Sequence, residues 1–277
     1  MSIKDILVQV DNTKACHHRL NVVRNLADRF DSHVAGMYVS PPIHIPAYTG
    51  VAVPTLAVAA LQDHQENLEK EARKAFDEMT DAWERKISWN YQESEIATAI
   101  TADSGVHDLV VLGQYDNDDD NDINVGVVDR VVIECGRPVL VIPHSHSDTG
   151  SDGNIAKRIV VAWNGKRESI RAIHDAMPFL EKAESVNIVS VSQPGYDELP
   201  GAGIAEHIAR HGINVETENL PNKGGSVGEI LLDTAKRYSA DMIVMGAYGH
   251  TRFREMVLGG ATHHVLKKSD VLVLMSH

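Results

Sequence analysis

Apolar and polar positions follow two periods along the chain, and these periods alternate in the same order in both halves. Short unbroken apolar runs predict strands that are buried on both faces, and apolar positions three and four residues apart predict helices. In the first half, the runs cover residues 6–10, 33–39, 109–112 and 138–142, with a weaker run near Trp89. Helical spacing covers residues 16–30, 61–87, 95–103 and 127–134.

The second half repeats this order. Its predicted strands cover residues 159–162, 186–191, 215–218, 242–245 and 271–275, and its helices cover 170–180, 202–211, 226–235 and 262–268. Strands that alternate with helices need crossover connections, which produce a parallel sheet covered on both faces. The predicted fold class is therefore α/β, with two tandem open parallel-sheet domains, each βαβαβαβαβ.

The segment between the halves, residues 144–157, is rich in Ser, Gly and Asp and has no apolar period, which is typical of a linker. We therefore expect a first domain at 1–143 and a second at 158–277. The last strand of each domain, 138–142 and 271–275, would leave an apolar sheet edge exposed, and such edges tend to pair. We expect these two strands to bring the domains together, and a further homodimer is left open.

Glycines gather after the strand at 242–245. Gly246 and Gly249 follow it directly, and Gly259 and Gly260 open the next helix. Glycine lets backbone N–H groups approach an anion closely, and the N-terminus of a helix favours phosphate. His250, Arg252 and Arg254 lie between the two glycine pairs and could add donors. From spacing alone, a phosphate site and an ordinary flexible turn are equally good interpretations.

The spacing Gly-x2-Gly-x9-Gly after the fourth strand, the opening strand that ends in an acid (ILVQVD, 6–11) and the repeated element order resemble the universal stress protein family. The resemblance implies the adenine nucleotide alpha hydrolase-like fold and ATP, with or without Mg²⁺, in the second domain. It implies that the motif glycines hold ribose and phosphates and that Val191 meets adenine through its backbone. Asn164 stands where nucleotide-binding members have Asp, and Gly260 where they have Ser or Thr. The implied site comprises Asn164, Val191, Gly246, Gly249, Gly259, Gly260, Ala261 and Thr262.

The first domain keeps the spacing of this motif but not its residues. Asp116 replaces the second glycine and opens the acidic run DNDDDND, which would repel phosphate. We therefore expect one ATP per chain and a degenerate first site. A calcium site in the acidic run is disfavoured, because the Gly and terminal Glu of an EF-hand are absent. The degenerate site comprises Asp11, Val39, Gly113, Asp116, Gly126 and Val127.

Composition narrows the possible functions. The 277 residues are 43% hydrophobic and carry a net charge of −13, which opposes general binding to nucleic acid or to an anionic membrane. The longest apolar stretch, 51–61, is broken by Pro54 and is too short to span a bilayer. The beginning does not have the pattern of a signal peptide, and two cysteines are too few for a disulfide framework. These features predict a cytoplasmic protein.

No convincing acid–base pair or nucleophile motif emerges, so we expect no catalytic residue, and we expect neither a metal site nor a redox cofactor. The sequence predicts a stress-response protein that binds ATP or another adenine nucleotide as a regulatory or signalling module. Two alternatives stay open. One is a slow ATPase, and the other is a nucleotide-free small-ligand-binding or scaffold protein whose working surface is the segment 40–60 and the helix after it.

Overall fold

The computed structural model describes residues 2–43, 55–81, 83, 86–114, 126–144, 155–192, 201–222, 224–249 and 260–277. The elements of the first half are β1 (Asp5–Val10), α1 (Lys14–Phe30), β2 (His33–Ser40), α2 (Thr55–Thr80), β3 (Ile87–Glu93), α3 (Ile96–Ser104), β4 (Leu109–Gly113), α4 (Val127–Glu134) and β5 (Val139–Ile142). Those of the second half are β6 (Arg158–Ala162), α5 (Arg167–Leu180), β7 (Ser185–Ser192), α6 (Ala202–Ala209), β8 (Val215–Pro221), α7 (Val227–Arg237), β9 (Met242–Gly246), α9 (Ala261–Lys268) and β10 (Leu272–Ser276). The α/β fold class is confirmed.

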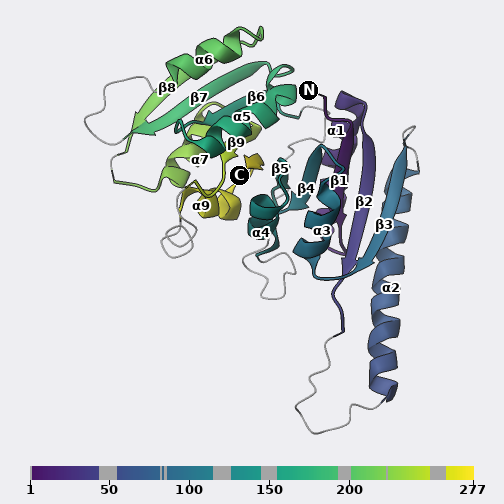
Figure 1. Ribbon diagram of the computed structural model, residues 1–277. Helices are drawn as coiled ribbons and strands as arrows, with labels where there is room; N and C mark the ends of the chain where they lie inside the picture. Colours follow the sequence, from purple (N-terminus) through teal and green to yellow (C-terminus); the bar gives the residue numbers. More distant parts are fainter. Residues whose placement is uncertain are drawn as a thin grey trace.

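The strands of both halves join into one ten-stranded sheet in the order β3-β2-β1-β4-β5-β10-β9-β6-β7-β8 (Figure 1). Neighbours within each half are parallel, while β5 and β10 pair antiparallel, with Val141 opposite Val273 and Leu140 opposite Leu274. The prediction that the halves pair through their last strands is confirmed. This pairing covers the apolar edge strand that each half would otherwise expose.

The sheet is buried on both faces, as its unbroken apolar runs require. One core lies between the sheet and α1, α2, α5 and α6, with Leu20, Phe76 and Phe179 among its members. The other lies under α3, α4, α7 and α9, with Ile100, Val131 and Val265. Among the described residues, no helix has the length and apolar composition needed to cross a membrane.

Both predicted ends of one helix were wrong. The helix expected at 61–87 is α2, which begins at Thr55 and ends at Thr80, because residue 87 already opens the edge strand β3. The end of the expected linker is not free chain: Ile155 and Ala156 are buried in the core, and Arg29 of α1 donates to the carbonyl of Ile155. Residues 145–154 lie outside the described residues.

Candidate functional site

In each half, the chain reverses its direction of travel across the sheet at one point. In the second half it runs from β6 outward to β7 and β8 and then returns to β9 on the other side of β6. Connections leave adjacent strands in opposite directions there, and the resulting crevice at the carboxyl ends is where open α/β sheets bind ligands. The equivalent point in the first half lies between β1 and β4.

The predicted nucleotide residues of the second half lie around the β6–β9 crevice. Asn164 follows β6 and is exposed, and its Oδ1 accepts a hydrogen bond from the backbone N–H of Lys166 at 3.0 Å. Gly246 ends β9, and Val191 lies in β7, which pairs with β6. A Cβ at position 246 would overlap the backbone of Glu168 and Ser169, so this glycine allows β9 to approach the first turn of α5.

The same first turn places an acid against the motif. A Cβ at Gly249 would lie 2.9 Å from Oε2 of Glu168, so a carboxylate borders the glycine that was expected to face phosphates. This carboxylate is not among the site residues expected from the sequence. Its signal is the acid four residues after Asn164, in the first turn of the helix that follows the strand.

Gly260 caps the N-terminus of α9 without a side-chain hydrogen bond, and the first turn of this helix contains no acid. Thr262 is buried, and its Oγ1 accepts from the backbone N–H of Tyr248 at 3.3 Å. The helix therefore presents N–H groups and a positive dipole end beside the glycine loop. Gly259, His250, Arg252 and Arg254 lie outside the described residues.

The loops that follow β4 and β9 also connect the two halves. Tyr248, whose φ of 56° is left-handed, donates its hydroxyl hydrogen to Oδ1 of Asp129 in the first turn of α4. Gln114 follows β4, and its Nε2 donates to the carbonyls of Leu266 (2.6 Å) and Ser269 (3.2 Å) at the end of α9. The predicted ligand loop of the second half is thus bonded to a helix of the first.

The crevice of the first half is filled by Arg19 of α1. Its side chain is fully buried, and Nη2 lies 2.5 Å from Oδ2 of Asp11, the acid that follows β1. Oδ1 of Asp11 accepts from the backbone N–H of Thr13 at 2.9 Å and from its hydroxyl. A Cβ at Gly113 would overlap Nη1 of Arg19, so the glycine at the end of β4 makes room for this guanidinium.

Burial and charge shift the pKa values of Asp11 and Arg19 in opposite directions. Burial raises the pKa of Asp11, but the positive charge of Arg19 and the hydrogen bonds from Thr13 outweigh it and leave the pKa lowered. Burial likewise lowers the pKa of Arg19, and the charge of Asp11 more than reverses this. Both groups are therefore ionised at neutral pH and neutralise each other.

The predicted degeneracy of the first site thus has a cause that the sequence analysis missed. It rested on Asp116, which lies outside the described residues, whereas the described crevice contains Arg19. The signal was present, because Arg19 lies three residues after Cys16 and one before Leu20 on the predicted apolar face of α1. The remaining predicted residues lie at element ends: Val39 is buried in β2, Gly126 caps α4 with a φ of 76°, and Val127 begins that helix.

The second half has no arginine at the matching place. Asp11 lies three residues before α1 and Arg19 five residues after its first residue, and the same spacings from α5 give Asn164 and Ala172. Ala172 is buried. The first crevice therefore contains the ion pair of Asp11 and Arg19. The matching positions of the second half hold the amide of Asn164 and the methyl group of Ala172.

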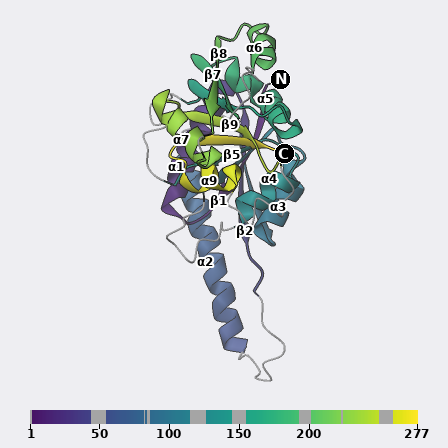
Figure 2. The same ribbon diagram turned by 90° about the vertical axis from the view of Figure 1, so that its left-hand side faces the viewer.

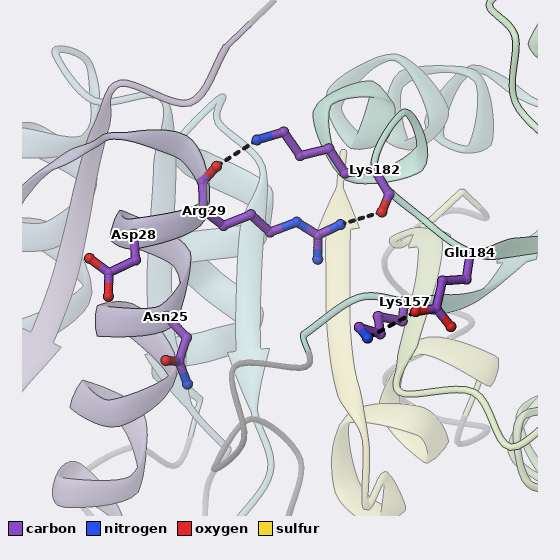
Figure 3. Close-up of a pocket in the computed structure, with 6 residues that line it drawn as sticks. All are labelled: Asn25, Asp28, Arg29, Lys157, Lys182 and Glu184. Atoms are coloured by element: carbon purple, nitrogen blue, oxygen red, sulfur yellow. Dashed lines mark hydrogen bonds and ion pairs between the residues drawn. The ribbon is translucent and has the colours of Figure 1, made fainter.

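A separate cleft of about 490 Å³ lies between the halves at the end of α1 (Figure 3). Arg29 donates to the carbonyl of Lys182 at 2.7 Å, and Nζ of Lys182 donates to the carbonyl of Arg29 at 2.5 Å. Lys157 pairs with Glu184 at 2.8 Å. Because all three cations are already bonded within the chain, this cleft is a contact between the halves and a poor anion site.

The described residues include no group of three His, Cys, Asp or Glu side chains arranged to hold a metal ion. Both cysteines are free and buried. Burial raises the pKa of Cys135, which makes its thiol less reactive.

Residues 156–277 match the model of the universal stress protein family. The second half of the chain is a universal stress protein domain. The match begins at Ala156 and therefore covers the crevice that contains Ala172, and not the one filled by Arg19. This match confirms the expected family for the second half of the chain.

Known proteins extend the comparison. A curated universal stress protein of Synechocystis is 32% identical over 151 residues, which are 53% of this chain and 49% of that relative, so the chain spans about half of its length. The crystal structure of a universal stress protein from Archaeoglobus fulgidus superposes with a TM-score of 0.73 at 16% identity, covering 99% of this chain and 96% of that one. A protein of unknown function from Pseudomonas aeruginosa gives 0.58 at 16% identity, covering 99% and 92%. These structures show that the whole chain has this fold.

Proposed function

We propose that the universal stress protein domain binds an adenine nucleotide, with ATP as the first candidate, in the crevice between β6 and β9. The protein would then act as a regulatory module in a stress response. One observation carries the proposal: Ala172 stands where the first half has Arg19, so the motif glycines of the second half do not accommodate a buried guanidinium.

The surrounding groups have the chemistry that a nucleotide requires. The N–H groups at the start of α9 suit phosphate oxygens, and the Asn164 amide can donate and accept hydrogen bonds without adding charge. Val191, on the strand next to β6, is positioned to offer its backbone to a base. These assignments follow the family resemblance.

The carboxylate of Glu168 bears on whether the nucleotide would bind alone or as a complex with a metal ion. A carboxylate about 4 Å from a phosphate charge costs about 1 kcal/mol in water and more where solvent is excluded. A divalent cation between the carboxylate and the phosphates would turn this repulsion into attraction. We therefore propose that the ligand is the Mg²⁺ complex of ATP, with Glu168 facing the cation.

Isothermal titration calorimetry of the full chain with ATP, in Mg²⁺ and in EDTA, tests the proposal. We expect one site per chain, with tighter binding in Mg²⁺. In EDTA, Gly249→Asp adds a second carboxylate beside Glu168 and the phosphates, which at an effective dielectric near 20 costs on the order of 4 kcal/mol, about a thousandfold in affinity. The matched control is Gly105→Asp, because a Cβ at Gly105 meets no other atom and this residue lies in the first half. Two sites per chain, or unchanged affinity in Gly249→Asp, would refute the model.

A further inference from the structure

Helix α2 extends well beyond the end of the sheet (Figures 1 and 2). Its C-terminal part packs on the body, where Ala72 and Phe76 are buried and the Phe76 ring lies 5.2 Å from that of Trp89 on β3. Its N-terminal part carries Leu56 and Leu61, which are 82% and 48% exposed. These exposed fractions are large for leucines in a helix whose C-terminal part is packed in a core.

The apolar stripe of α2 continues past the point where the sheet ends. Positions 58, 61, 68, 72, 76 and 79 are apolar and lie on one side of the helix, in steps of three or four residues except for the seven-residue step from 61 to 68, where His64 and Gln65 interrupt the stripe. Among the described residues of this stripe, those that pack in or against the core are Ala72, Phe76 and Met79. Of the exposed large apolar side chains in the described part of the chain, three of five lie on α2 or β3, and Tyr91 is 46% exposed.

A groove of about 560 Å³ lies between the protruding part of α2 and the end of β3. We name it the α2–β3 groove. Nε2 of Gln65 donates to the carbonyl of Pro41 at 2.6 Å, which holds the chain after β2 against the helix. The groove is lined by Ile43, Val58, Ala59, Gln62, Asp63, Gln65, Glu66, Tyr91 and Glu93.

The described lining of the groove combines apolar and amide side chains with three exposed acids, which form its acidic rim. Asp63, Glu66 and Glu93 line it, and the lining residues that the structure describes include no basic side chain. Glu66 pairs with Lys70 at 3.4 Å, but both side chains are exposed, and such pairs contribute little. Since the chain has a net charge of −13, nothing in its overall charge offsets the rim.

The acidic rim favours a positively charged binding partner over a second copy of the chain. In a symmetric dimer the same patch faces itself, so a second copy would bring three acids against three acids. A positively charged segment would instead pair with the rim and place an apolar side chain against Val58 and Tyr91. Tyr91 suits such a contact, because a half-exposed tyrosine offers apolar area with a polar tip.

We infer that the α2–β3 groove docks a short basic segment of another protein, with an apolar side chain between Val58 and Tyr91 and Lys or Arg side chains against Asp63, Glu66 and Glu93. The inference does not depend on nucleotide binding. It gives the first half, whose crevice is filled by Arg19, a role of its own.

Fluorescence anisotropy with a labelled model peptide of alternating Leu and Lys clusters tests this inference, without nucleotide. A peptide of the same length with Glu in place of Lys is the charge control. We expect the basic peptide to bind, the acidic one to bind at least about tenfold more weakly, and added salt to weaken binding. Asp63→Lys with Glu66→Lys should lower the affinity for the basic peptide by about tenfold, as should Tyr91→Ala.

Matched variants separate docking from general attraction to an acidic chain. Glu181→Lys with Glu229→Lys makes the same change in net charge on exposed positions of the second half and should leave affinity within about twofold. Val106→Ala removes an exposed apolar side chain elsewhere and should have no effect. Circular dichroism confirms that each variant is folded.

Three results would overturn the inference. The first is equal loss of affinity in the groove and control charge variants. The second is equal binding of the acidic peptide. The third is self-association of the wild-type chain in sedimentation velocity that Val58→Glu abolishes, since Val58 lines the groove and this would make a second copy the occupant. Failure of ATP binding would leave the peptide result unchanged, so the two proposals fail separately.

Discussion

Arg19→Ala should destabilise the first half strongly, because it leaves the buried carboxylate of Asp11 without its counter-charge. The Arg19 side chain is only 1% exposed and that of Asp11 3%, and their ion pair measures 2.5 Å. Removing one partner of a buried pair costs about 3–5 kcal/mol. Thr13 still donates two hydrogen bonds to Asp11, so we expect a value near the lower limit, about 3 kcal/mol.

The double variant Asp11→Asn with Arg19→Ala provides the decisive comparison, since it reproduces the Asn164 and Ala172 of the second half. It removes both charges, and we expect it to recover about 1–2 kcal/mol of the loss, within the range of coupling for contacting residues. Urea denaturation gives the total change, and hydrogen exchange of peptides from α1 and α5 assigns it to one half. Equal losses in the single and double variants, or no loss in Arg19→Ala, would refute the role of the ion pair.

The same variants predict a pH dependence. In the wild type, the folded-state pKa of Asp11 is lowered, so its stabilisation is present above the unfolded value of about 3.9 and is lost as pH falls through the lower folded value. In Arg19→Ala, the arginine no longer lowers the folded pKa of Asp11, so this pKa lies above the wild-type value and the destabilisation is relieved as pH falls through it. The stability difference between wild type and variant should therefore be largest at neutral pH and shrink toward pH 4. A constant difference would contradict this sign.

Two further variants probe the second half. Glu168→Gln removes the carboxylate beside Gly249 and should raise the affinity for ATP in EDTA by about fivefold, with a smaller gain or a loss in Mg²⁺, measured by calorimetry. Equal gains in both buffers would remove the cation from the model. Tyr248→Phe deletes the hydrogen bond to Asp129 and should cost about 1.5–3 kcal/mol at the contact between the halves, seen as faster hydrogen exchange in α4. Unchanged exchange would show that this bond contributes nothing there.

Much of the fold could be predicted from the sequence, because parallel strands buried on both faces leave unbroken apolar runs. The antiparallel pairing of β5 with β10 also followed, since each is an apolar strand at the end of its half. The ends of α2 could not be placed, because its apolar spacing continues through positions that have no sheet beneath them. Local pattern shows which side of a helix is apolar, but not what covers it.

The candidate site was less accessible to sequence reasoning. Glycine spacing located the loops correctly, yet the same spacing accompanies two different physical causes. Gly113 makes room for Arg19, which lies on another element, whereas Gly246 lets β9 approach the backbone of α5. Only the contacts across elements separate these causes. A charged residue on an apolar helix face, such as Arg19, is the local sign that a crevice contains a side chain.

The loop after β9 contacts both halves of the chain. It lies at the proposed nucleotide crevice, and through Tyr248 it is bonded to Asp129 in the other half. Tyr248 has a left-handed backbone, a conformation that costs energy for a non-glycine residue and persists only where its surroundings hold it. Thr262 and Asp129 are two of those surroundings, one in each half. If the proposed nucleotide binds, a ligand that changes the position of this loop must therefore change a contact in each half, which couples the proposed crevice to helix α4 of the first half.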